Sequence, residues 1–104
     1  MTAEQNGNIA ATHIYEDCPE LREVDDIIEN CFLKGDFATC FRRMMKLALT
    51  GYPLAECQVG WFYIHGYGAE ANPRKARYWL KRALKHGDPD AEENLREINE
   101  TGEL

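Results

Sequence analysis

The stretch GYGAEANPRKARYWLKRALKHGDPDA, residues 66–91, sets two aromatic side chains among basic ones, between two turns that contain glycine. Its chemistry allows two interpretations: a nucleic-acid surface on which bases stack, or a helix whose aromatic side chains face a core. Asn72-Pro73 is typical of a helix start, because the Asn side chain accepts backbone N–H groups and proline already has a helical φ. Gly87 is typical of a helix end, since glycine tolerates the left-handed conformation. The stretch therefore predicts a helix over 73–86.

Within this predicted helix the apolar residues recur every three or four positions, which indicates one buried stripe. We expect Trp79, which lies on the stripe, in the core, and Tyr78, one position away, at its edge. The basic side chains fall on the other face, where their stems cover apolar surface and their charges can pair with the acids that follow the helix. The stripe is Ala76, Trp79, Leu80, Ala83 and Leu84; the bases are Arg74, Lys75, Arg77, Lys81, Arg82 and Lys85; the acids are Asp88, Asp90, Glu92 and Glu93. This assignment, with a net charge of −6, argues against nucleic-acid binding.

The sequence matches itself when it is aligned with an offset of 36 residues. Gly51 then falls on Gly87 and Pro53 on Pro89, so that turn residues match turn residues. Small or apolar residues also match one another: Cys40 with Ala76, Met44 with Leu80, Ala55 with Ala91 and Val59 with Leu95. A period of this length is typical of stacked helical hairpins, each too small to bury its own apolar face.

Residues 55–91 read A-x3-V-G-W-F-Y-x2-G-x-G, a short loop, then N-P-x-K-A-x2-W-L-x-R-A-x3-G-x3-A. This pattern resembles the Sel1-like repeat, a relative of the tetratricopeptide repeat. Residues 20–51 fit it more loosely, because Thr39-Cys40 replaces the lysine-alanine step and Arg43 replaces the aromatic residue. The resemblance implies a scaffold or adaptor that binds other proteins, and it carries no shared catalytic residues.

The predicted fold class is all-α: a short right-handed α-solenoid of about two and a half helical hairpins, five helices in all. We expect a flexible N-terminal arm over 1–18 and a single helical-repeat domain over 19–104. Within that domain the predicted parts are a hairpin over 19–51, a repeat unit over 53–87 and a terminal helix over 88–101, with the first helix running over 19–33.

The residues give no catalytic or metal site. No CxxC pair occurs, and no histidine has a ligand spacing to a cysteine. Cys57 and His65, eight apart on one predicted helix, would lie about 12 Å apart, too far for a thiolate–imidazole pair. GYGAEA lacks the Lys-Ser/Thr step of a phosphate loop. We therefore expect no enzyme activity, no cofactor, no metal and no small-molecule substrate.

The chain has no leader-like N-terminus and no apolar run near the roughly 20 residues of a membrane span. Taken as complete, it is expected to be cytoplasmic, without a membrane partner. Its four cysteines are then expected as reduced thiols.

The predicted helix 54–65 supplies the candidate binding surface. In stacked hairpins the first helix of each pair lines the concave side, and tryptophan is enriched at interface hot spots. Trp61 is therefore the predicted centre of a concave groove that grips a protein partner, although packing against the preceding hairpin or the arm is equally compatible with its position. Its inward stripe is Ala55, Val59, Phe62 and Tyr63; its opposite stripe is Cys57, Gln58, Trp61, Ile64 and His65. The candidate rim residues are either the bases Arg42, Arg43 and Lys46 or the acids Glu23, Asp26 and Glu29.

Charge supports an alternative function. Residues 1–34 carry eight acidic and two basic side chains. Such a segment suits a small inhibitor, such as an immunity protein or a blocker of a nuclease complex, that electrostatic attraction steers to a basic partner through its acidic 16–29 region. A short array also has exposed ends, which either are capped by polar residues or form a homodimer contact.

Overall fold

The computed structural model describes residues 18–101, and side chains up to residue 98. The described chain is all-α. Its elements are α2 (Pro19–Ile27) with its π-helical continuation η1 (Ile28–Phe32), α3 (Phe37–Ala48), α4 (Pro53–His65), α5 (Pro73–Lys85) and α6 (Ala91–Thr101). The predicted all-α class and the five helices are confirmed over these residues. Apart from Cys18, the predicted arm lies outside them.

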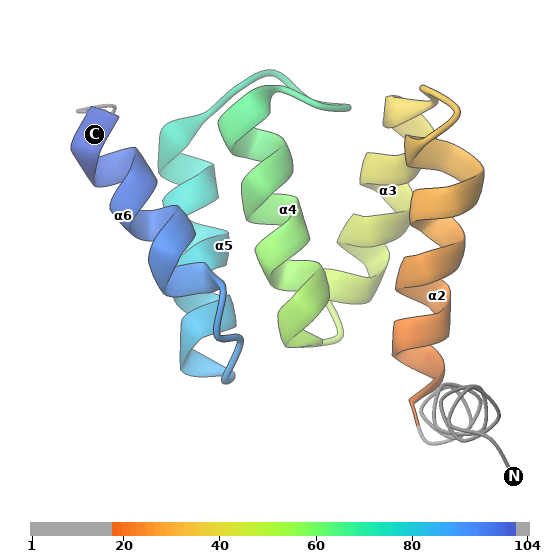
Figure 1. Cartoon of the computed structure of the whole chain (residues 1–104), viewed down its shortest axis with the longest axis horizontal. Helices are drawn as coiled ribbons and strands as arrows, with labels where there is room; N and C mark the ends of the chain where they lie inside the picture. The colour runs from red at the N-terminus through yellow and green to blue at the C-terminus, as the bar shows by residue number, and fades with distance from the viewer. Residues whose placement is uncertain (1–17, 102–104) are drawn as a thin grey trace, which may run out of the picture.

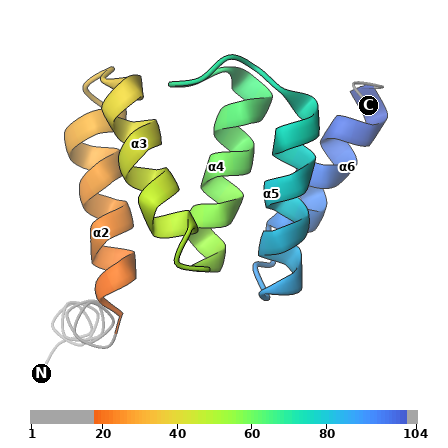
Figure 2. The ribbon, with the colours of Figure 1, turned by 180° about the vertical axis from the view of Figure 1, so that it is seen from behind.

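Each helix packs on its neighbours in sequence, as the repeat predicts. The closest packing joins α4 to α5, and α3 to α4; α4 also contacts α6. In Figure 1, α2 and α6 lie toward the viewer on either side of α4. The reverse view in Figure 2 brings α3 and α5 forward. The helices therefore form two layers, with the first helix of each hairpin in one layer and the second in the other.

Local sequence explains where the helices begin. The Asn72 side chain accepts a hydrogen bond from the Lys75 backbone N–H at 3.0 Å, and Asp36 accepts one from Thr39 N–H at 3.3 Å. Both close the first turn of a helix, at α5 and α3, by satisfying a free backbone donor. Proline occupies the first turn of α2, α4 and α5, where its missing N–H costs no hydrogen bond.

Two predicted boundaries differ from the structure. The last part of the predicted helix 19–33 is π-helical, because Leu33 N–H bonds to Ile28 C=O, five residues back, at 2.9 Å. The predicted terminal helix 88–101 begins instead at Ala91. There the Asp88 carboxylate accepts a hydrogen bond from Asp90 N–H at 3.1 Å, a local turn that delays the helix.

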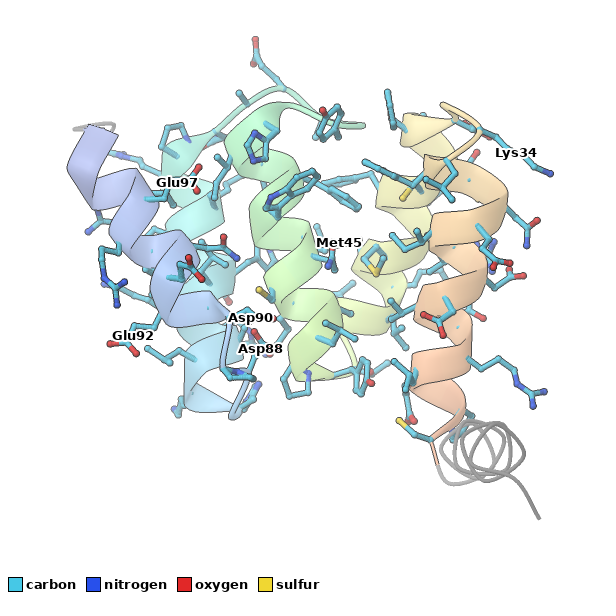
Figure 3. All side chains as sticks on the ribbon, viewed as in Figure 1. Lys34, Met45, Asp88, Asp90, Glu92 and Glu97 are labelled. Atoms are coloured by element: carbon cyan, nitrogen blue, oxygen red, sulfur yellow. The ribbon has the colours of Figure 1, made fainter. Side chains whose placement is uncertain are left out.

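The core runs along the whole array between the two layers. Ile27, Met44, Val59 and Leu80 are fully buried, and Trp79 is buried as the apolar stripe predicts. Tyr78 remains 55% exposed. The core also extends between hairpins: Figure 3 shows Met45 between α3 and α4, where it packs against buried residues. Neighbouring hairpins thus supply each other's apolar contacts.

Over residues 18–101, no helix combines the length and the apolar composition needed to cross a bilayer.

Candidate functional site

A hollow of about 460 Å³ lies between η1, the exposed side of α4 and the start of α6. We call it the concave groove. Its floor comes from α4, and its two walls come from the first helices of the neighbouring hairpins. It is lined by Ile28, Phe32, Leu33, Leu54, Cys57, Gln58, Trp61, Phe62, Asp90, Glu93 and Asn94. Most of these side chains are apolar, so the groove suits an apolar segment of another molecule.

Trp61 is held in place by the aromatic residues around it. Its ring stacks on Tyr67 with centroids 5.3 Å apart, and it meets Phe32 edge-on at 6.1 Å. The His65 ring lies 4.3 Å from it. Trp61 is nevertheless only half-buried, so part of the indole faces the groove. Trp61 therefore packs on the preceding hairpin through Phe32 and also lines the concave groove.

The turn between α4 and α5 positions Tyr67. Gly68 has φ of +75°, and a Cβ there would lie 2.3 Å from the Phe37 carbonyl oxygen. Only glycine fits this approach, which brings the turn against the start of α3. Tyr67 also contacts the Phe37 ring, with centroids 4.8 Å apart. The turn thus fixes the aromatic residue that supports Trp61.

The sequence predicted Cys57 on the exposed stripe of α4, and this prediction is wrong. Cys57 forms part of the groove floor but is buried. It is 4% exposed, because the start of α6 covers it: the Asn94 side-chain amide donates to its sulfur at 3.4 Å. Burial, with the nearby Asp88 carboxylate, raises the pKa of Cys57 to about 12. The thiol is therefore protonated near neutral pH and is a poor nucleophile.

Acidic side chains border the groove on the α6 side. Asp90 and Glu93 both line it, and both are exposed. In Figure 3, Asp90 lies near α4, whereas Glu92, the neighbour of Glu93 in sequence, points to the outer side of α6. We call Asp90 and Glu93 the acidic rim.

A buried carboxylate lies on the side of α4 that faces α5. Glu56 is fully buried, and its two oxygens contact Arg82 Nε at 3.2 Å and His86 Nδ1 at 2.7 Å. Arg82 therefore does not take the partner that the sequence suggested, an acid following helix α5. Its partner comes from α4, because the two helices lie against each other. Arg82 also lies over the rings of Tyr78 and Trp79.

The structure divides the predicted site residues into separate places. Gln58 and Trp61 line the groove, His65 lies beside Trp61 at its edge, and Ile64 is half-buried against the core. All four residues belong to α4, and the helical period predicts that they lie on one side of it.

The remaining predicted residues lie away from the groove. Arg43 bridges from α3 to Glu23 at 2.9 Å and to Asp26 at 2.8 Å on α2, and it holds the pKa of Asp26 below its ordinary value. Arg43, from one of the two predicted rims, therefore partly neutralises Glu23 and Asp26, from the other. Glu29 is exposed on η1. A second, smaller hollow beside this cluster is lined by Pro19, Glu20, Glu23, Arg43, Lys46, Leu47 and Thr50.

Sequence reasoning missed the acidic rim, Tyr67 and Glu56. Glu56 falls three positions before Val59 and seven before Tyr63, both inward-facing, so the helical period could have placed it in the core. Tyr67 lies in a turn, where no period applies. The rim depends on how far α6 reaches across α4, and this distance is set by packing rather than by local sequence.

The described residues contain no group of three His, Cys, Asp or Glu side chains placed to hold a metal ion.

In a comparison with known protein families, the family model of the Sel1 repeat matches residues 53–88. No curated protein and no solved structure matched the chain. The matched range covers α4, the turn and α5, which are the elements that form the groove floor and its support. Sel1 repeats generally mediate protein binding and are typically non-catalytic. Residues 53–88 are therefore a Sel1 repeat, a unit of the tetratricopeptide-like α-repeat family, set within an all-α array.

Proposed function

We propose that the chain is an adaptor that binds a segment of a protein partner in the concave groove over Trp61. The observation that carries this proposal is the half-buried indole in a hollow lined mainly by apolar side chains. A tryptophan held rigidly by its neighbours loses little conformational entropy on binding, and it offers a large apolar surface.

The groove also has the composition of a protein-binding site rather than of a catalytic one. The thiol of Cys57 has a raised pKa, and the polar side chains among the described lining residues are the amides of Gln58 and Asn94 and the acidic rim. Amides and carboxylates at the edge of an apolar surface can pair with the backbone or side chains of a bound segment.

The alternative function, inhibition through the acidic 16–29 segment, receives less support. Arg43 already binds Glu23 and Asp26, so these two carboxylates are partly neutralised within the chain. The acidic side chains best placed for a partner are those of the rim.

Site-specific photocrosslinking tests the proposed function. A benzophenone side chain replaces Gln58 in the groove and, as a matched control, Tyr78, which is 55% exposed on α5 outside the groove. Both variants are expressed in cells that naturally contain the protein. We expect a crosslinked partner from position 58 and none from position 78, and the Trp61→Ala change in the position-58 variant should lower the yield about tenfold or more.

Circular dichroism and the unfolding midpoint establish that the Trp61→Ala chain is folded. If Trp61→Ala lowers stability too far, Gln58→Arg provides a second variant, since it places a larger side chain in the groove and removes no aromatic ring. In that case the benzophenone is left out. The amount of partner that is captured is compared between the wild-type chain and the Gln58→Arg chain. Equal crosslinking from positions 58 and 78, or a yield unaffected by both groove variants, would contradict the proposed function.

A further inference from the structure

We infer that the segment bound in the groove is basic as well as apolar: it places a lysine or arginine beside its apolar side chains, where that cation meets the acidic rim. This inference rests on the proposed function and specifies the chemistry of the partner. It assigns partner selection to Asp90, in the turn before α6, and to Glu93 of α6. Both lie outside the acidic N-terminal region to which net charge alone directs attention.

The first support is the charge of the groove lining. Among the described residues that line the groove, Asp90 and Glu93 are the only charged ones, and none is a lysine, arginine or histidine. A bound segment therefore meets two negative charges and no positive ones. A partner with acidic side chains at this position would be repelled, and so would a nucleic-acid backbone.

The second support is that three cationic side chains of the described chain contact carboxylates other than those of the acidic rim. Arg82 and His86 contact Glu56 on the opposite side of α4, and Arg43 contacts Glu23 and Asp26. The carboxylates of the acidic rim form no ion pair with them. They remain exposed and available to a partner.

The third support is the arrangement of charge around the apolar floor. Trp61, Leu54 and Phe32 offer apolar contact, while the two rim carboxylates of the described lining lie at the edge formed by the start of α6 and the turn before it. When the bound segment runs across α4 with an apolar side chain on Trp61, a lysine or arginine next to that side chain lies close to the acidic rim. Charged pairs at the edge of an interface contribute to the association rate and to orientation, and they weaken with salt.

Selection from a phage library of random dodecapeptides against the full chain tests the inference. Synthetic versions of the enriched peptides are then titrated, at low and at high salt, against wild type, Trp61→Ala, Glu93→Gln, the double variant Asp90→Asn/Glu93→Gln, and Glu92→Gln. Glu92→Gln is the matched control: it removes the same charge from the same helical turn, but on the outer side of α6.

We expect the enriched peptides to combine apolar residues with lysine or arginine. The double variant should weaken their binding about tenfold at low salt and less at high salt, whereas Glu92→Gln should change it less than about twofold. Trp61→Ala should weaken binding at both salt concentrations.

Other results separate the two proposals. Peptides that need Trp61 but contain no basic residue, or that bind the double variant as well as wild type, would overturn the basic-partner inference and leave the groove as the binding site. Peptides indifferent to Trp61→Ala, or no enrichment at all, would overturn both. If sedimentation shows that the chain associates with itself in a way that Trp61→Ala abolishes, the occupant is a second copy and the inference is wrong.

Discussion

Glu56 shows how this fold places a charged residue in its interior. The side chain has no exposed surface, yet both carboxylate oxygens have partners: Arg82 of the facing helix α5 and His86, which directly follows that helix. These partners are themselves partly exposed, so only the acid is withdrawn from water. A buried carboxylate with charge-assisted hydrogen bonds to a neighbouring helix fixes the register of the two helices, because a shift of one residue would leave it unpaired.

Replacement of Glu56 by glutamine should therefore destabilise the fold. Glutamine preserves the volume but removes the charge that Arg82 and His86 meet, and we expect the free energy of unfolding to fall by about 1–3 kcal/mol. Urea unfolding monitored by circular dichroism measures this difference. Glu92→Gln, the same change at the equivalent position of the next unit and on an exposed site, should stay within about 0.5 kcal/mol of wild type. Equal stability of the two variants would contradict the role given to Glu56.

Among single residues, the sequence predicts those that follow a period. Trp79 in the core and Gln58 and Trp61 on the concave side follow from their spacing along a helix. Cys57 does not, because α6 crosses over it and covers a position that α4 alone would leave exposed. Tyr67 and the acidic rim also depend on contacts between elements, and no period within one element contains that information.

At the scale of the elements, the contact between α4 and α5 depends on Gly60. A Cβ at this position would lie 2.7 Å from Leu80 Cγ and 3.2 Å from the Ala76 carbonyl oxygen. The two helices thus approach more closely than a side chain would permit. Helix boundaries were well predicted where a cap or a proline marks them, as at Asn72 and Pro73. They were less well predicted at η1, because an apolar spacing of three and four does not distinguish a π turn from an α turn.

The Gly60→Ala variant tests this contact. Alanine favours an isolated helix by about 1 kcal/mol over glycine, whereas the overpacked contact should cost about 1–3 kcal/mol. We expect a net loss of stability in urea unfolding. In a Leu80→Ala background the same change should cost less, because the nearest obstructing atoms are gone. A Gly60→Ala chain that is more stable than wild type would show that the helices are not in close contact.

At the scale of the whole molecule, the described repeat units differ in the contacts that they can make. Arg96 of α6 takes the repeat position that Gly60 has in α4, and it is exposed. A further hairpin could not pack on α6 as α5 packs on α4, because the arginine side chain would occupy the contact. The predicted homodimer through the exposed ends, the division into 19–51, 53–87 and 88–101, and the cytoplasmic location stay predictions.

The central claim, that a partner segment binds over Trp61, has a direct readout because the chain contains two tryptophans. One indole lies at the groove and the other, Trp79, is in the core. The measurement is a two-dimensional NMR spectrum of the ¹⁵N-labelled chain. The chain is titrated with a synthetic peptide of the partner segment that the photocrosslinking at position 58 identifies. We expect the Trp61 indole N–H signal to shift with added segment while the Trp79 signal stays in place. A Trp61 signal that does not move at saturating segment, while backbone signals elsewhere shift, would contradict the claim.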